Sequence, residues 1–158
     1  LDSEGKVIGI NTAIIGAGGS VGIGFAVPSN NAKRIIPDLL KYGYVRRPWL
    51  GVEPIPTVYL RRLGLDIPEG MLISRVVRGA TAAKAGLRGA TRQVVVGRYQ
   101  VPWGGDILTH VNQQPVRTME ELAAQIETRK AGEVITLDYI RDNRKESVKA
   151  TLVLRPRS

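Results

Sequence analysis

Cysteine is absent from this sequence, and histidine occurs once, at position 110. The lack of cysteine excludes disulfides and thiolate chemistry, and it leaves the redox compartment open. One histidine cannot build a metal site, so we expect neither a metal nor a cofactor. His110 lies in the run DILTHVN, which is typical of a strand, and we interpret it as a side chain on a sheet surface.

Long apolar runs are missing as well. No segment approaches the roughly 20 apolar residues that span a membrane, and no charged start followed by an apolar stretch resembles a signal peptide. The chain opens on Leu1 in a strand-like context, and its first methionine is Met71. We therefore expect the natural N-terminus to lie upstream of Leu1.

Aromatic residues are scarce, at 5%, whereas glycine occurs 18 times and proline 9 times. This composition favours many turns and short strands over a helical bundle. Apolar residues make up 43% of the chain, which is enough to bury a core. The composition thus predicts a folded protein of mixed, mainly β structure.

The formal charge is +9, with 23 basic and 14 acidic residues. Such a surface attracts phosphates, anionic lipids and acidic peptides. The basic residues are scattered and lack the interleaved aromatics of a nucleic-acid platform, so we expect no specific nucleic-acid partner. A basic anion-binding domain stays open as an alternative, and it predicts binding that falls steeply with salt.

The first part of the chain predicts two strands and a helix. The apolar, β-branched runs that indicate strands cover residues 5–15 and 21–27. Ser29 is expected to cap a helix over Asn30 to Tyr42, which Gly43 ends and Pro37 kinks.

A linker around Arg46, Arg47 and Pro48 separates this part from a second unit, and we place the domains at residues 1–45 and 46–158. Thr118 and Glu121 predict a capping box, and Asp142 with Asn143 predicts a hairpin turn. Residues 86–105 are interpreted as an insertion, which we expect to form a small hairpin or a lid. The expected strands are 50–55, 70–76, 106–112, 134–141 and 147–154, and the expected helices are 58–63, 82–85 and 119–128.

Two groups of motifs carry a resemblance to a known family. The segments LDSEGKVIGINTAI and GGSVGIGFAVPSN resemble the stretch after the active-site serine in HtrA/Deg serine proteases. The later segments WLGV, GMLISRV, AAKAGL, GGDILTHVNQQPV and MEELAAQI resemble the PDZ domain that follows it. The resemblance implies the last strands of a trypsin-like β-barrel with a helix, then a circularly permuted PDZ domain, a small β-barrel or sandwich with helices.

The resemblance also implies that this chain carries no catalytic triad. The family's nucleophile lies in a GNSGG motif before the position of Leu1, and its histidine and aspartate lie earlier still. A serine nucleophile needs a positioned imidazole, and the one imidazole here belongs to the second unit. The parent resembles an ATP-independent serine endopeptidase of protein quality control, whereas this polypeptide is expected to be inactive.

By resemblance, part of the protease substrate cleft remains in the first unit. Thr12, Ala13 and Ile14 match the strand that pairs with the substrate backbone, and Ile14 would line an apolar specificity pocket. Ile23 to Phe25 would form another wall. A structural alternative stays open here, in which Ile14 and Phe25 are simply core residues.

The PDZ resemblance implies capture of a peptide C-terminus by β-augmentation. The carboxylate would be held by the loop of Trp49, Leu50, Gly51 and Val52, where glycine lets several amides converge on one anion. Leu122 and Ile126 would face a core in any amphipathic helix, so the alternative of plain packing stays open. The expected pocket for an apolar last side chain consists of Leu50, Val52, Met119, Leu122 and Ile126.

Pro54 and Pro56 depart from the family pattern. If Val52 faces the peptide, strand alternation makes positions 54 and 56 face it too, and proline has no N–H to donate. We expect a groove that holds the carboxylate and one side chain but pairs poorly with upstream residues. A bulge that shifts the register by one would undo this expectation.

The family also implies a bacterial periplasmic or envelope location and a homotrimer built through the protease domain. For the chain itself we expect a strand-paired dimer, or disorder before Pro28, because strands that have lost a barrel expose apolar edges. A non-catalytic PDZ scaffold is the remaining alternative. The residues that precede Leu1 in the gene would distinguish it, through the presence or absence of GNSGG.

Overall fold

The structure is a computed structural model that describes residues 1–14 and 24–156. The chain divides into two compact units, residues 1–46 and 47–158. Each unit is described by itself.

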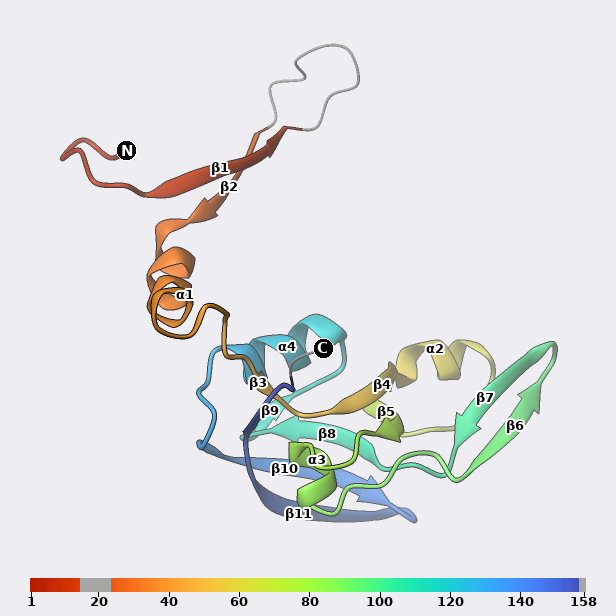
Figure 1. Ribbon diagram of the computed structural model, residues 1–158. Coiled ribbons are helices and arrows are strands. Elements are labelled where there is room, and N and C mark those ends of the chain that lie inside the picture. Colours follow the sequence, from red (N-terminus) through yellow and green to blue (C-terminus); the bar gives the residue numbers. More distant parts are fainter. Residues whose placement is uncertain (15–23, 157–158) are drawn as a thin grey trace. The chain divides into compact units, whose positions relative to one another are not determined.

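Unit 1 contains a two-stranded antiparallel sheet and one helix (Figure 1). β1 (Gly9–Ile14) pairs with β2 (Gly24–Pro28), with a register shift between Asn11 and Ala13. α1 (Ser29–Tyr42) follows directly and runs through Pro37. It ends at Gly43, whose φ of 73° and N–H bond to Leu39 form the expected left-handed cap.

The predicted cap at the start of α1 is wrong. The helix begins at Ser29 itself, the capping position is taken by Pro28, and no side chain there makes a capping hydrogen bond. Pro28 still belongs to β2, where it pairs with Gly9, so the strand leads into the helix without a capping turn. At the other end, Asp38 accepts hydrogen bonds from the backbone and guanidinium of Arg46, which lower the pKa of that carboxyl group.

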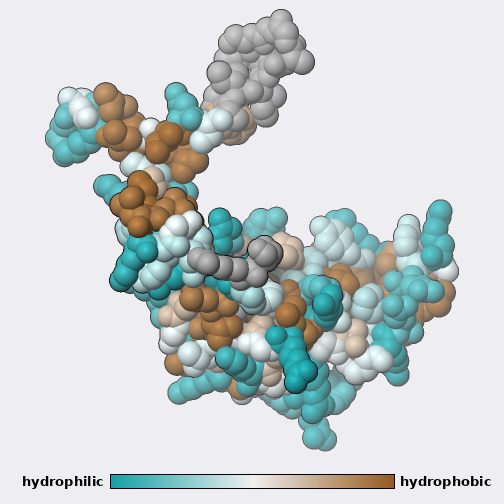
Figure 2. Space-filling model, in the orientation of Figure 1, coloured by the Kyte–Doolittle hydropathy of each residue, from teal (hydrophilic) through white to brown (hydrophobic). Residues whose placement is uncertain are grey.

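Among residues 1–12 and 25–46 of unit 1, none is buried. Apolar surface is visible over this unit in Figure 2. Leu40 is 84% exposed and Ile8 is 57% exposed. A helix and two strands of this composition therefore present apolar faces that their own packing leaves uncovered. The other exposed large apolar residues of unit 1 include Val7, Ile10, Phe25, Val27, Ile36 and Leu39.

Unit 2 is built on a larger antiparallel sheet with the strand order β11-β10-β8-β5-β4, to which β9 adds beside β8. β4 is the last strand of that order and has β5 as its neighbour. A short ladder joins β12 to β3. The strands are β3 (Pro48–Trp49), β4 (Val52–Pro56), β5 (Met71–Val76), β8 (Ile107–Val111), β9 (Gln114–Pro115), β10 (Val134–Arg141), β11 (Arg144–Thr151) and β12 (Val153–Leu154).

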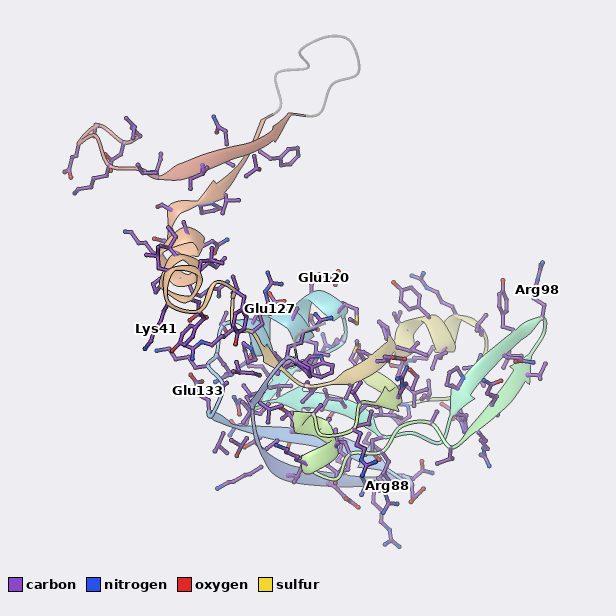
Figure 3. All side chains as sticks on the ribbon, in the orientation of Figure 1. Lys41, Arg88, Arg98, Glu120, Glu127 and Glu133 are labelled. Carbon is purple, nitrogen blue, oxygen red and sulfur yellow. The ribbon has the colours of Figure 1, made fainter. Side chains whose placement is uncertain are left out.

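Three helices and a hairpin complete unit 2. The helices are α2 (Thr57–Arg62), α3 (Thr81–Lys84) and α4 (Met119–Glu127). The predicted insertion forms a hairpin of β6 (Arg92–Val96) and β7 (Tyr99–Trp103), which projects from the sheet with Arg98 at its tip (Figure 3).

The core of unit 2 lies between the sheet and α4. Leu122 and Ile126 of α4 pack with apolar residues of the strands, and a second cluster packs around α2 and the base of the hairpin. The main cluster includes Leu50, Met71, Ile73, Leu108, Val111, Ile135, Leu137 and Leu152, and the second includes Leu60, Ile67, Leu72, Val101 and Ile107.

The local predictions for unit 2 mostly hold. Asp142 and Asn143 adopt φ values of 47° and 63°, as a tight hairpin turn requires. Thr118 caps α4 by accepting the N–H of Glu121 at 3.2 Å. The prediction of the second capping-box bond, from Thr118 N–H to the Glu121 carboxylate, is wrong. That carboxylate accepts the N–H of Arg117 instead, at 2.6 Å.

The expected strand over 147–154 is divided in two. Leu152 interrupts it, and its backbone exchanges hydrogen bonds with the loop before β10, from Leu152 N–H to Glu133 and from Gly132 N–H to Leu152. The chain then leaves β10 and pairs with β3 instead. Leu152 is almost fully buried, so burial of its side chain accompanies the change of partner.

Candidate peptide-binding site

The loop before β4 is fixed by hydrogen bonds that its three consecutive carbonyl groups accept. Trp49 C=O accepts from the hydroxyl of Thr81 at 2.7 Å. Leu50 C=O accepts from the N–H of Ala82 at 2.9 Å, and Gly51 C=O accepts from the N–H of Val77 at 2.8 Å. All three carbonyls therefore point toward one segment, residues 77–82.

This arrangement fixes where the amides of the loop point. In a planar trans peptide, the C=O of one residue and the N–H of the next lie on opposite sides. Because the carbonyls of residues 49–51 point toward residues 77–82, the N–H groups of Leu50, Gly51 and Val52 point away from that segment. Successive amides directed outward from one tight loop are the geometry that binds an anion.

Gly51 is required at its position for two reasons. Its φ is 74°, in the left-handed region that disfavours residues with a Cβ atom. A Cβ atom there would also lie 2.0 Å from the Cβ of Ala80, which is itself buried. The loop thus packs against the 77–82 segment at a distance that only glycine allows.

A pocket of about 190 Å³ lies beside this loop, between β4 and α4. Leu50, Leu122 and Ile126 form a buried apolar floor. Met119 is 47% exposed and lies at the first turn of α4, so its side chain borders solvent. The pocket is lined by Trp49, Leu50, Gly51, Val52, Met119, Leu122 and Ile126, together with Pro54, Ala123, Glu127 and others.

The rim of the pocket carries charge. Arg47 and Arg155 both line it, and the Arg155 N–H donates to Arg47 C=O at 2.9 Å. The Arg155 guanidinium lies 5.9 Å from the centre of the Trp49 ring. Glu127, at the end of α4, supplies a carboxylate on the same rim (Figure 3). The two guanidinium groups favour an anion beside the outward amides of the loop.

The structure thus brings together every residue that the sequence predicts for the second unit's site. The four loop residues and the five pocket residues, two of which are shared, surround one pocket. Thr81, Ala80 and the rim arginines were missed by the sequence analysis. Thr81 and Ala80 lie about thirty residues downstream of the loop, and no motif connects a buried threonine to a distant carbonyl.

The residues predicted for a protease cleft lie on the small sheet of unit 1. Thr12 donates to the carbonyl of Phe25 at 3.2 Å, and β1 pairs Ala13 with Phe25 and Ile14 with Gly24. Phe25 is 49% exposed, so it is not a core residue of this unit. Ile23 lies outside the described residues.

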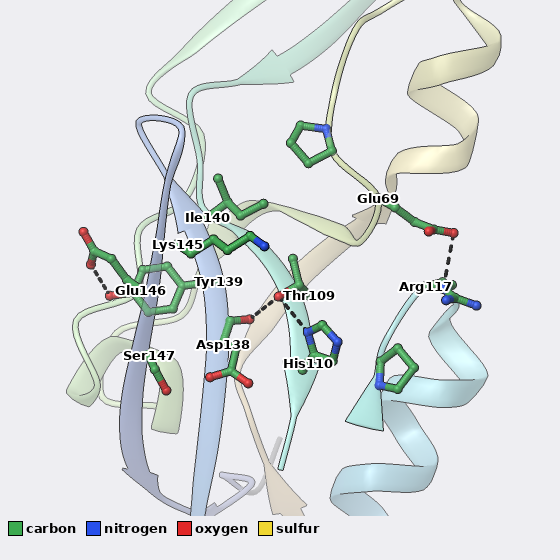
Figure 4. Close-up of a pocket in the computed structure, with 12 residues that line it drawn as sticks. Glu69, Thr109, His110, Arg117, Asp138, Tyr139, Ile140, Lys145, Glu146 and Ser147 are labelled. Atoms are coloured by element: carbon green, nitrogen blue, oxygen red, sulfur yellow. Dashed lines mark hydrogen bonds and ion pairs between the residues drawn. The ribbon is translucent and has the colours of Figure 1, made fainter. Parts of the chain in front are cut away.

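A larger cavity of about 570 Å³ lies elsewhere in unit 2, over β8, β10 and β11 (Figure 4). His110 lines it from β8, as a half-buried residue with Nδ1 3.1 Å from the hydroxyl of Thr109. Tyr139 also lines it and donates to Glu146 at 2.8 Å; burial and this hydrogen bond raise the pKa of Tyr139. The walls of this cavity mix both signs of charge.

The sequence analysis also addressed metal binding and membrane-spanning segments. Within residues 1–14 and 24–156, no cluster of three or more His, Cys, Asp or Glu side chains could hold a metal ion. In the same described ranges, no helix is long and apolar enough to cross a membrane.

Comparison of the sequence with known protein families identifies the family of this chain. The family model of the PDZ domain matches residues 21–152, which is most of the chain. The chain therefore belongs to the PDZ domain family. A mainly β fold that contains a PDZ domain was predicted from the sequence and is confirmed.

The relatives that carry this domain are serine proteases of the Deg and HtrA type, as the sequence motifs predicted. The chain is 36% identical to a probable periplasmic serine protease do/HhoA-like of Haemophilus influenzae, over 94% of this chain and 29% of that protein. It is 34% identical to the periplasmic pH-dependent serine endoprotease DegQ of Escherichia coli, over 96% of this chain and 31% of DegQ. These names agree with the predicted periplasmic or envelope location.

Similar solved structures are also HtrA-type proteases. The HtrA-type protease AlgW with a decapeptide matches at a TM-score of 0.71 and 29% identity, covering 100% of this chain and 45% of that one. AlgW with a tripeptide matches at 0.66 and 30% identity, covering 48% of that chain. The chain thus spans about three tenths of the length of the curated relatives and under half of AlgW.

Proposed function

We propose that unit 2 binds the C-termini of peptides and unfolded proteins that end in an apolar residue. The observation that carries the proposal is the set of three loop carbonyls held by residues 77–82, which turns the amides of Leu50, Gly51 and Val52 outward beside an apolar pocket. The amides and the rim arginines bind the terminal carboxylate, and the pocket takes the last side chain. Peptides in the AlgW structures support a peptide ligand.

The experiment is a binding selection with the purified chain. A library of random peptides with free C-termini is compared with the same library amidated. The proposal predicts enrichment of aliphatic last residues that amidation abolishes. Binding that ignores the terminus and follows peptide acidity would contradict the proposal and make the net charge of +9 the cause.

For the parent protein we propose a periplasmic, HtrA/Deg-like serine endopeptidase of protein quality control. The names of the curated relatives and the HtrA-type structures support this role. The parent would form a homotrimer through its protease domain, with residues 1–45 as the end of that domain and residues 46–158 as the PDZ domain. Thr12, Ala13, Ile14, Ile23 and Phe25 would then belong to its substrate cleft.

For the chain alone we propose a dimer paired through unit 1. The exposed apolar residues of the β1–β2 sheet and of α1 support it, because such faces gain stability when a second copy covers them. Light scattering tests the proposal, with Ile10→Lys as a variant that places a charge on the exposed sheet. A dimer that becomes monomeric in the variant is expected. A wild-type chain that is already a monomer would contradict it.

A further inference from the structure

β4 presents an open edge beside the proposed carboxylate loop. It is the last strand of the large sheet in unit 2, and β5 is the strand that pairs with it (Figure 1). A peptide that adds to this sheet would therefore lie along β4 and exchange backbone hydrogen bonds with it.

The hydrogen bonds of β4 show which of its residues face that edge. Gly51 C=O accepts from Val77 N–H at 2.8 Å, and Glu53 C=O accepts from the Ser74 hydroxyl at 2.7 Å. Thr57 N–H donates to Gly70 at 2.9 Å. These odd-numbered residues face β5. Because successive residues of a strand direct their backbone groups to opposite sides, positions 52, 54 and 56 face the open edge.

A β-bulge is present at this point, and it leaves the alternation of β4 intact. Glu53 pairs with Arg75, whereas Pro54 pairs with Ile73, so Ser74 is the extra residue. The bulge therefore belongs to β5 and not to β4. Its Ser74 hydroxyl supplies the hydrogen bond to Glu53 that is described above.

The open edge consequently offers acceptors but few donors. Val52 presents both an N–H and a C=O, whereas Pro54 and Pro56 present a C=O alone. With the carboxylate on the loop, an antiparallel peptide places its last residue opposite Val52, its third-last opposite Pro54 and its fifth-last opposite Pro56. The carbonyls of the third-last and fifth-last residues would receive no hydrogen bond from β4.

We infer that this groove recognises the terminal carboxylate and the last side chain of its ligand, and that residues further upstream add little to the binding affinity. The inference rests on the proposed function and narrows its ligand class. The ligands are short apolar C-terminal tails, which need to project only about three residues and carry no required upstream sequence. Pro54 lines the pocket itself, so the missing donor lies within the site.

The test is calorimetric titration of the full chain with N-acetylated, free-carboxylate peptides of three and eight residues that share one aliphatic C-terminus. For the wild type, the two Kd values should agree within about twofold. Pro54→Ala should tighten both peptides by about three- to tenfold, the effect of one added hydrogen bond. Pro56→Ala should tighten only the eight-residue peptide, because the tripeptide does not reach position 56.

Pro102→Ala, in β7, is the matched control and should leave both Kd values unchanged. Wild-type affinity that climbs tenfold or more with length, while the two β4 variants bind like the wild type, would overturn the inference. If no free-carboxylate peptide binds, or if amidated peptides bind equally well, the proposed function itself fails. The two failures are therefore distinct.

Discussion

The hydroxyl of Thr81 donates a 2.7 Å hydrogen bond to the carbonyl oxygen of Trp49. The Thr81 hydroxyl oxygen in turn accepts the N–H of Val153 at 2.9 Å, and Thr81 is fully buried. One side chain thus joins α3, the proposed carboxylate loop and β12. We interpret Thr81 as a positioning residue for the loop, because its hydroxyl bonds to backbone groups of the protein and Thr81 does not line the pocket.

Thr81→Val should weaken peptide binding. The change keeps the shape but leaves the buried groups without their partner, which costs about 1–3 kcal/mol. We expect the Kd for a free-carboxylate peptide to rise at least fivefold, with a lower midpoint of thermal unfolding. Thr81→Ser keeps the hydroxyl and should restore the Kd. Equal binding by the valine and serine variants would show that the hydrogen bond does not position the loop.

Gly51→Ala should abolish detectable binding, because a Cβ atom at φ 74° also meets Ala80 at 2.0 Å. Gly64→Ala is the matched control, since Gly64 has φ 85° but open space around its Cβ position. The control variant carries only the backbone strain of about 1–2 kcal/mol and should bind peptide normally. Calorimetry and thermal unfolding compare the two; a shared loss of binding would assign the effect to strain alone.

Two truncations in α4 should separate specificity from stability. Met119→Ala removes a half-exposed side chain at the pocket mouth, so we expect a preference for larger last residues with unfolding changed by about 0.5 kcal/mol or less. Ile126→Ala opens the buried core and should cost about 2–5 kcal/mol. Peptide selections and urea unfolding measure both effects. An unchanged preference in the Met119 variant would place the last side chain elsewhere.

The ion pair of Asp106 and Arg141 should stabilise the fold. The guanidinium binds both carboxylate oxygens at 2.7 and 2.8 Å, and Asp106 is 1% exposed. These bonds raise the pKa of Arg141 above its usual range. Arg141→Met leaves a buried charge unpaired and should cost about 3–5 kcal/mol in urea unfolding.

Arg75→Met is the control for that experiment, because the Arg75–Glu53 pair is exposed on both sides. It should change the free energy of unfolding by about 1 kcal/mol or less. Similar losses of unfolding free energy in the two variants would mean that burial does not increase the contribution of the Arg141–Asp106 ion pair to stability.

Tyr139 should make stability fall at alkaline pH. Burial, followed by the hydrogen bond to Glu146, raises its pKa in the folded state. A raised folded pKa contributes stability that is present below the unfolded value near 10 and is lost as pH rises through the folded value. Tyr139→Phe should flatten the slope of unfolding free energy against pH above 9, whereas Tyr99→Phe, at an exposed site, should keep it. Identical slopes for all three proteins would contradict the prediction.

Local features were predictable because neighbouring residues decide them. Gly43 ends α1, Thr118 caps α4, and Asp142 with Asn143 turns the last hairpin, as the sequence predicts. Each depends on φ preferences or on a side chain that reaches three residues along the chain. The prediction that Ser29 caps α1 is wrong because a contact with a residue distant in the sequence decides this position. Pro28 pairs with Gly9 in the β1–β2 sheet, and α1 begins at Ser29, one residue earlier than predicted.

The sequence by itself determined the family, the glycine of the loop, the apolar pocket positions and the two prolines of β4, because residue identity and short-range order are enough for these. Only the tertiary structure decided where the loop amides point, since Thr81, Ala82 and Val77 come from a distant segment. It also decided that the bulge belongs to β5, because pairing register arises between strands. Contacts across long loops leave no local periodicity in a sequence, and the direction of a peptide plane depends on them.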